Sequence, residues 1–557
     1  MKTTPVRTAR TLPLIVVAAV FLLWMTPGLV GRDLWKADEP YSFGMIYHIV
    51  NTGDWVVPTL AGEPFMEKPP LFYLTAAGFV RLLSPGVLTP HDAARMACVF
   101  YMLLTVLFIG LAARELFGRD HSAIAVIVLI GSAGLQVTAH KLITDISMIA
   151  GISMALYGLA VSRRRYAIGG LLLGTGAGIG FMSKGLLAPG MIGVTAILLP
   201  VIFAEWRRKS YFHTLLIACA AAVPWSFIWP VALYLRSPVD FIEWFWYQNL
   251  GRFLGYSHVG REFSWTFYFV HLPWFALPSL PIALWAIWHN RRSLRAYSGI
   301  SIPLLMFLVM FLVLTLSSSI RNIYALPMLI PLSLLAAAGA GSLPDRAKRT
   351  INATGLVLFG ALALLLWVGW IAVITGSPAF LSNKLHVFQP DYTPAFNAVL
   401  FAAACIYTAL WFFAITRSAR FEHAYLLNWT AGMVLGWGLM MTIWLPWLDA
   451  GSGYRDMFLS LREKIPARCN YVLMQGLGES ERGLLQYYTG VLPRNITDKN
   501  IGECDFLLTQ SGSEPVAPPN TVEWQLVWER WRPSKPQDRP KEIFTLLQRK
   551  EGKRNCQ

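Results

Sequence analysis

The sequence predicts a mostly helical protein that crosses a membrane about thirteen times and ends in a small soluble α/β domain. Of its 557 residues, 55% are hydrophobic and 14% are charged, whereas a soluble domain carries about 25% charged residues. The apolar residues gather into runs of about 20, the length that a helix needs to cross a bilayer. After Trp447 the chain turns polar, and short strand-like runs begin. This pattern excludes both a soluble globular protein and a disordered one.

The apolar runs that predict spans lie at 11–30, 93–112, 122–140, 144–161, 167–183, 186–205, 213–235, 265–288, 299–317, 323–342, 351–375, 395–416 and 424–447. The first run follows Lys2, Arg7 and Arg10, as the apolar part of a signal peptide would. Its core is longer than the roughly 7–15 residues of such a peptide, and no small-residue cleavage site follows it. We therefore expect a retained helix.

The net charge of +16 is explained by topology. With the N-terminus in the cytoplasm, the predicted cytoplasmic loops hold most of the cations, namely Arg114, Arg119, Arg163, Arg164, Arg165, Arg207, Arg208, Lys209, Arg291, Arg292, Arg295, Arg346, Lys348, Arg349, Arg417 and Arg420. Short loops on the other side hold single cations such as Lys141. This asymmetry follows the positive-inside rule. It indicates membrane lipids as partners rather than nucleic acid, and it places the C-terminus on the outer face.

Two apolar segments are too short to span. The run at 71–83 has about 13 residues, and counting it as a span would move the triple arginine at 163–165 to the outer side. Residues 38–50 also predict a short helix at the membrane surface. Residues 31–92 therefore form one large external loop with two interfacial helices, within a membrane domain that covers 1–449.

Residues 450–557 predict the small α/β domain, on the outer face of the membrane. Its strand-like runs lie at 471–474, 506–508, 522–527 and 543–547. Cys469 and Cys504 fall in this domain, where an oxidising environment permits a disulfide. Cys98, Cys219 and Cys405 lie in predicted spans and are expected to be packing residues.

The chain has only 31 Asp and Glu residues, so their positions are informative. Asp38, followed by Glu39 and Pro40, is typical of a helix start with Asp38 as the N-cap. A carboxylate fixed at a helix N-terminus is also a well-placed catalytic base, and both interpretations can hold. The sequence Glu67-Lys68-Pro69-Pro70 is either a turn before the next helix or an ion pair that offers Lys68 to an anionic headgroup.

Further polar residues lie at the outer ends of spans. Asp145 is either an N-cap or a site acid at the bilayer edge. Lys184 is either a snorkelling lysine or a phosphate ligand. Arg321 lies at the outer edge, shortly before Tyr324.

The external loop before residue 265 is rich in aromatic residues and carries Arg252, His258, Arg261 and Glu262. Such loops often form only an interface belt, but arginine also binds phosphate in a bidentate way. His258 and Glu262 are spaced to pair or to share a divalent metal, with Glu67 as a further candidate ligand. Two or three ligands are few for a metal site, so no cofactor is required.

All these polar clusters fall on the outer side. A flippase or transporter of lipid-linked sugars would place ionisable residues near the midplane and show inverted repeats, and the sequence shows neither. A non-catalytic scaffold gives no reason for acids and cations to gather on one face. The pattern favours an enzyme that acts at the outer interface on a partly lipid substrate.

The first external loop resembles that of a known family. The stretches LWKADEP at 34–40, GDWVVP at 53–58 and EKPPL at 67–71 are similar to those of bacterial polyprenyl-phosphate-sugar-dependent glycosyltransferases of the GT-C fold. These include the 4-amino-4-deoxy-L-arabinose transferases of lipid A and, more distantly, protein O-mannosyltransferases. Weaker matches over roughly 10–340 are TD at 144–145, SKG at 183–185, RF at 252–253, PW at 273–274 and YALP at 324–327.

The resemblance implies a monomeric enzyme of the bacterial inner membrane with a periplasmic C-terminal domain. It would transfer a sugar, with inversion, from undecaprenyl phosphate to an acceptor, and aminoarabinose transfer to a lipid A phosphate is the expectation. A protein O-glycosyltransferase or a transferase for another envelope glycan is the alternative. Asp38 and Asp145 match the catalytic acids, and Lys68, Arg252, Arg321 and Lys184 are the expected donor-phosphate ligands. Glu39, Glu67, Arg261 and Tyr324 are expected to support the site or bind substrate.

The chain departs from this family at one point. Aminoarabinose transferases typically continue Asp-Glu with a small residue and then Arg-Tyr, whereas Pro40, Tyr41 and Ser42 follow here. A cation expected near the donor phosphate is therefore missing from the loop. Arg252, Arg261 and Arg321 are the candidates to replace it.

Overall fold

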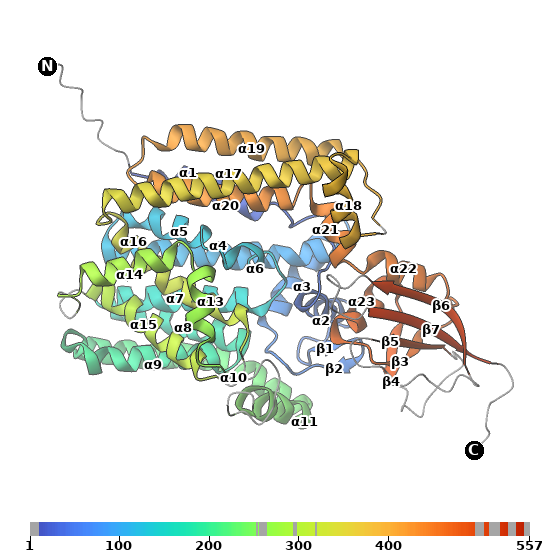
Figure 1. The fold of residues 1–557 in the computed structure, drawn as a ribbon. Helices are drawn as coiled ribbons and strands as arrows, with labels where there is room; N and C mark the ends of the chain where they lie inside the picture. Colours follow the sequence, from blue (N-terminus) through green and yellow to red (C-terminus); the bar gives the residue numbers. More distant parts are fainter. Residues whose placement is uncertain are drawn as a thin grey trace.

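The computed structural model describes residues 11–251, 254, 264–292, 294, 298–317, 320–390, 392–495, 506–511, 524–532 and 542–550. Helices make up most of it, and a small sheet lies at one end of the helical bundle (Figure 1). Within the described residues, seven helical segments are long and apolar enough to cross a membrane: α4 (Pro90–Phe117), α7 (Thr144–Ser162), α8 (Tyr166–Lys184), α10 (Lys209–Arg236), η3 with α16 (Asn322–Met328 and Leu329–Ala340), α17 (Asp345–Thr375) and α19 (Ala398–Ser418). The chain is therefore a multi-pass membrane protein.

Within the described residues, two bent pairs of helices each have the length and composition of one further span. The axes of α13 (Phe267–Phe275) and α14 (Ser279–His289) differ by 102°, and those of α20 (Ala424–Met440) and α21 (Leu445–Ser452) by 66°. The remaining predicted runs hold shorter apolar helices, namely α1 (Leu14–Met25), α5 (His121–Ile130), α9 (Leu187–Ile202) and α15 (Ser298–Thr315). Every predicted run thus contains a helix, although not every helix has the length of a full span.

Both short segments of the first loop are helical. They form α2 (Asp38–Thr52) and α3 (Leu71–Leu83). Between them, β1 (Thr59–Leu60) pairs antiparallel with β2 (Glu63–Pro64). Ala61 and Gly62 at the turn both have positive φ, which is the geometry of a two-residue hairpin that matches strand twist.

Glycines allow α7, α8 and α10 to pack closely. A Cβ added to Gly151 would lie 2.6 Å from the carbonyl oxygen of Gly176, and one added to Gly158 would lie 2.6 Å from the amide nitrogen of Leu173. Small residues of this kind let transmembrane helices approach backbone to backbone. Because α7 and α8 run antiparallel, their packing brings Asp145 at the start of α7 next to Lys184 at the end of α8.

The C-terminal part contains α22 (Arg455–Arg462), α23 (Glu479–Thr489) and a five-stranded sheet with the order β4-β3-β5-β7-β6. The strands are β3 (Tyr471–Gln475), β4 (Leu492–Asn495), β5 (Phe506–Ser511), β6 (Trp524–Arg532) and β7 (Glu542–Arg549). β3 is parallel to β4 and β5, whereas β7 is antiparallel to β5 and β6. The four predicted strand-like runs correspond to β3, β5, β6 and β7, and β4 was not predicted.

Helix α23 packs against α2 and so joins the sheet region to the first loop (Figure 1). At their closest approach, a Cβ on Gly483 would lie 2.9 Å from the carbonyl oxygen of Pro40. Lys36 forms ion pairs with Glu481 at 2.8 Å and with Glu542 at 2.7 Å. Burial lowers the pKa of the Lys36 amine, but Glu481 outweighs this and raises it above its usual range.

Candidate active site

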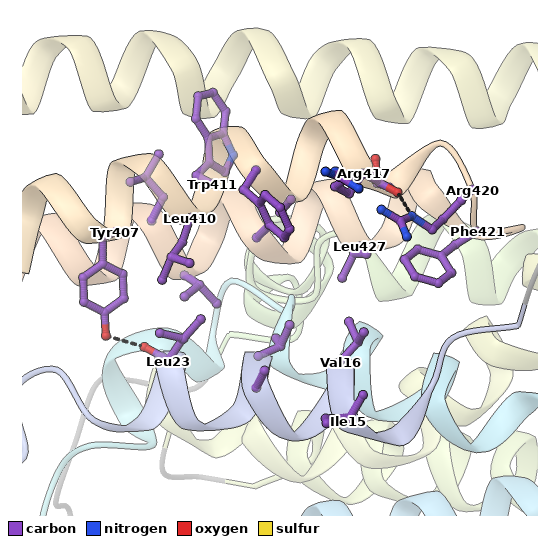
Figure 2. A pocket seen from close by; sticks show the side chains of 18 residues that line it. Ile15, Val16, Leu23, Tyr407, Leu410, Trp411, Arg417, Arg420, Phe421 and Leu427 are labelled. Carbon is purple, nitrogen blue, oxygen red and sulfur yellow. Dashed lines mark hydrogen bonds between the residues drawn. The ribbon is translucent and has the colours of Figure 1, made fainter.

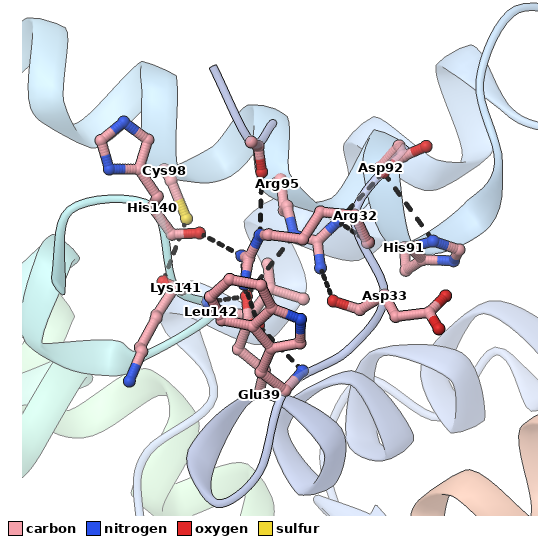
Figure 3. Close-up of polar contacts among 12 residues, drawn as sticks. Arg32, Asp33, Glu39, His91, Asp92, Arg95, Cys98, His140, Lys141 and Leu142 are labelled. Carbon is pink, nitrogen blue, oxygen red and sulfur yellow. Dashed lines mark hydrogen bonds and ion pairs between the residues drawn. The ribbon is translucent and has the colours of Figure 1, made fainter. Parts of the chain in front are cut away.

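A buried cluster of charges fixes the start of α2 (Figure 3). The Glu39 carboxylate is fully buried and accepts two hydrogen bonds from Arg32, at 2.7 and 2.8 Å. It also accepts bonds from the backbone amides of Trp35 and Leu142, at 3.2 and 3.3 Å. Burial raises the pKa of the Glu39 carboxyl, but the Arg32 and Arg95 guanidiniums outweigh burial and lower it to about 2. Glu39 therefore holds the loop in place and faces neither of the pockets described below.

Arg95 extends this cluster from α4. Its guanidinium donates to the carbonyl oxygens of Arg32 and Asp33, at 2.7 and 2.9 Å, and to the Asp92 carboxylate at 3.0 Å. Sequence reasoning missed both arginines. A signal was present, because an arginine inside an apolar run needs a buried partner.

Asp38 lies in the first turn of α2 and is not its N-cap. The N-cap is Ala37, and no side chain caps the helix. The Oδ1 atom of Asp38 instead accepts hydrogen bonds from Arg321 at 3.2 Å and from the Tyr41 hydroxyl at 3.3 Å. The capping interpretation was therefore wrong, and the carboxylate takes part in a polar network.

Tyr41 joins Asp38 to Lys68. Its hydroxyl accepts a hydrogen bond from the Lys68 ammonium at 2.7 Å, and Glu67 lies 3.8 Å from the same ammonium. Burial lowers the pKa of the Lys68 amine, but the nearby Glu67 carboxylate raises it well above its usual value. Lys68 is therefore charged at neutral pH, and only 11% of its side chain is exposed.

Asp145 also lies in a first turn without capping it, since the N-cap of α7 is Ile143. The interpretation of Asp145 as an N-cap was wrong as well. Its carboxylate pairs with Lys184, whose ammonium lies 4.4 Å from the centroid of the Tyr324 ring. Here α7, α8 and η3 meet.

The first of two pockets at the site, termed the α9–α15 pocket, has a volume of about 400 Å³. Its polar lining consists of Glu67, Lys68, Lys184, Gln248, Asn249, Ser317 and Tyr324. Its apolar lining consists of Leu186, Leu187, Gly190, Met191 and Val194 around α9, and of Leu250, Val313 and Leu314. A pocket lined by both cations and apolar side chains suits an amphipathic ligand with an anionic head.

The second pocket, termed the α2–α23 pocket, has a volume of about 490 Å³ and a more polar lining. Its lining includes Lys36, Asp38, Tyr41, Glu67 and Arg321 from the membrane part, and Gly476, Gly478, Glu479, Ser480, Glu481 and Gln510 from the C-terminal part. Glu67 lines both pockets, so the two cavities meet beside Lys68 and Tyr41. Sequence reasoning did not anticipate the wall contributed by the C-terminal part.

Arg321 lines the α2–α23 pocket rather than the pocket around Lys184. Burial lowers the pKa of its guanidinium, but the Asp38 carboxylate raises it above its usual range, so a cation is fixed beside Asp38. The other predicted loop residues, Arg252, His258, Arg261 and Glu262, lie outside the described residues. Over the described part of the chain, no group of three or more potential metal ligands is found.

The fold is the GT-C fold that the sequence predicted. The crystal structure of ArnT from Cupriavidus metallidurans bound to undecaprenyl phosphate superposes with a TM-score of 0.68 and 16% identity, over 96% of this chain and 97% of that one. The family model for dolichyl-phosphate-mannose-protein mannosyltransferases matches residues 67–229.

Particular relatives extend the similarity to most of the chain. An undecaprenyl phosphate-alpha-4-amino-4-deoxy-L-arabinose arabinosyl transferase from Edwardsiella ictaluri is 29% identical over 77% of this chain and 76% of its own length. The enzyme of that name from Serratia proteamaculans is 26% identical over 83% of this chain and 82% of its own. The resemblance indicated by the loop motifs is confirmed.

Proposed function

We propose that the protein transfers a sugar from undecaprenyl phosphate to an acceptor at the periplasmic face of the bacterial inner membrane, with inversion at the anomeric carbon. The sugar is of the aminoarabinose type, and the acceptor is a phosphate of lipid A. The observation that carries this proposal is the meeting of the α9–α15 and α2–α23 pockets at Glu67, where the Lys68–Tyr41–Asp38 network lies. The names of the relatives, and the carrier bound to the Cupriavidus protein, support it.

The α9–α15 pocket accommodates the donor. Its apolar lining receives the first isoprene units of the carrier, and the phosphate lies near Lys68 and Lys184. Fixed cations of this kind stabilise the negative charge that develops on a departing phosphate. Because Lys68 is already charged and buried, it needs little reorganisation during the reaction.

The sugar then lies where the pockets meet. The bond between the anomeric carbon and the phosphate oxygen breaks, and a bond between that carbon and an acceptor oxygen forms on the opposite face. Undecaprenyl phosphate leaves with one more negative charge, which an anionic phosphate acceptor has given up. A phosphate acceptor therefore requires no proton transfer, whereas a hydroxyl acceptor passes its proton to a base within hydrogen-bond reach.

Asp38 is the residue placed for this step. Its Oδ1 atom is held by Arg321 and Tyr41, and the carboxylate lines the α2–α23 pocket, where the acceptor enters. With a phosphate acceptor, the carboxylate stabilises the cationic character of the sugar or binds its amino group. With a hydroxyl acceptor, it is the general base.

The proposal includes a topology in which this site faces the periplasm. The chain crosses the membrane about thirteen times, with a cytoplasmic N-terminus and a periplasmic domain over residues 450–557. The disulfide at Cys469 supports this orientation, because disulfides persist in oxidising compartments.

A donor and acceptor panel tests the proposal. The purified full-length protein is incubated with undecaprenyl-phosphate-linked aminoarabinose or mannose and with lipid A, a Ser/Thr-rich peptide or an envelope glycan. Mass spectrometry should find the aminoarabinose adduct on lipid A alone. Modified peptide with unmodified lipid A would instead identify a protein O-glycosyltransferase, and no transfer from any donor would overturn the proposal.

A further inference from the structure

A groove is lined by residues of α1, α19 and α20 (Figure 2). Its volume is about 410 Å³. Its lining is apolar along the length, with Val16, Val20 and Leu23 from α1, Leu410 and Ala414 from α19, and Ala431, Val434 and Leu435 from α20. None of these residues belongs to either pocket at the active site.

The two ends of the groove differ in chemistry. At one end the Tyr407 hydroxyl donates a hydrogen bond to the carbonyl oxygen of Leu23 at 2.8 Å and ties α19 to α1. At the other end Arg417 and Arg420 lie together beside Phe421 (Figure 2). Both arginines are exposed, and the described residues include no ion-pair partner for either of them. The Arg420 side chain is held by a bond from Nε to the Arg417 carbonyl oxygen at 2.9 Å.

The groove is about as long as the hydrocarbon part of one bilayer leaflet is thick. Tyr407 and Arg417 are ten residues apart on α19, which corresponds to about 15 Å along the helix axis. The hydrocarbon core of a bilayer is about 30 Å thick, so the groove reaches from a headgroup position to the membrane midplane. Tyr407 lies near the middle of α19 and Arg417 near its end.

We propose that this groove binds one anionic phospholipid, with an acyl chain along α1 and α19 and the phosphate on Arg417 and Arg420. Arginine binds phosphate oxygens with paired N–H donors, and basic pockets at the ends of transmembrane helices recognise anionic headgroups. The apolar lining alone would accept a chain from any lipid. The two arginines give the site its preference for an anionic headgroup.

The test uses the full-length protein in nanodiscs that contain trace phosphatidylglycerol or phosphatidylcholine with a photoreactive group at the end of one acyl chain. Crosslinked peptides are mapped by mass spectrometry. We expect phosphatidylglycerol to label α1 and α19 around Leu23 and Tyr407. The double variant Arg417→Gln/Arg420→Gln should reduce that labelling on the order of twentyfold.

Two matched controls separate this site from general lipid contact. Arg346→Gln/Arg349→Gln removes a basic pair from the start of α17 and should leave the labelling unchanged. Ala19→Phe fills the groove and should abolish the labelling, whereas Ala18→Phe, which faces a different groove, should not. Equal labelling by phosphatidylcholine, or an equal loss in both arginine double variants, would overturn the proposal.

Discussion

The ammonium of Lys68 lies 2.7 Å from the hydroxyl of Tyr41 and donates a hydrogen bond to it. The tyrosine supplies no charge, but its hydroxyl also donates to Asp38. Arg321, from a distant part of the chain, forms an ion pair with the same Asp38 carboxylate at 3.2 Å.

Tyr41→Phe tests whether the Tyr41 hydroxyl, which bridges Lys68 and Asp38, contributes to transfer. The variant removes hydrogen bonds to a charged ammonium and to a carboxylate, each worth about 1.5–3 kcal/mol. We expect transfer to slow by about 10- to 100-fold, and Tm to fall as well because Tyr41 is buried. Steady-state kinetics measure the effect, and Tyr166→Phe at an exposed position is the control. Turnover equal to that of the control would show that the bridge has no part in transfer.

Glu39→Gln tests whether the ion pair between Arg32 and Glu39 stabilises the fold. The substitution leaves the Arg32 guanidinium buried without its carboxylate, which costs about 3–5 kcal/mol. Thermal unfolding of the purified protein should show a clear fall in Tm. Glu422→Gln, whose side chain is half exposed, should leave Tm unchanged, and equal Tm values for the two variants would contradict the structural role of Glu39.

The Glu39 carboxylate also predicts that the protein loses stability as the pH falls. The pKa of Glu39 is lowered to about 2 in the folded protein from a usual value of 4.5. A lowered carboxyl pKa stabilises the fold above pH 4.5, and this contribution, roughly 3 kcal/mol, is lost as the pH falls toward 2. Tm measured from pH 7 to pH 3 should therefore fall less steeply in Glu39→Gln than in the wild type. Parallel curves would exclude Glu39 as the titrating group.

Gly483→Val tests whether the C-terminal part completes the site. A side chain at this position meets the Pro40 carbonyl oxygen, and such overpacking costs about 1–3 kcal/mol. Hydrogen exchange should increase in α2 and α23, and transfer should fall because the α2–α23 pocket loses a wall. Gly86→Val, at a position with open space around it, is the matched control. Normal transfer despite increased exchange would show that this wall is dispensable.

Local patterns predicted the parts of the fold that depend on local sequence. The helix α3 has the predicted bounds because a short apolar run between two Pro residues and a polar turn has clear ends. β4 was missed because Pro493 interrupts its pattern. Proline is tolerated there because β4 is an edge strand that pairs only with β3.

The candidate site was predicted residue by residue but not as an arrangement. Asp38, Lys68, Asp145 and Lys184 were singled out, and the structure links Asp38 to Lys68 through Tyr41 and pairs Asp145 with Lys184. The Glu481 contact with Lys36 joins residues hundreds of positions apart. No periodicity within a segment encodes such a contact, so the wall of the α2–α23 pocket could not be predicted.

In the proposed reaction, Lys68 holds the donor phosphate and Asp38 acts in the transfer step. Donor binding and single-turnover transfer, measured side by side on purified Asp38→Asn and Lys68→Met, test it most directly. We predict that Asp38→Asn binds the undecaprenyl-phosphate sugar normally but transfers it about 10²- to 10⁴-fold more slowly. Lys68→Met should instead weaken donor binding by about 10- to 100-fold. Near-normal turnover by a folded Asp38→Asn protein would contradict the account.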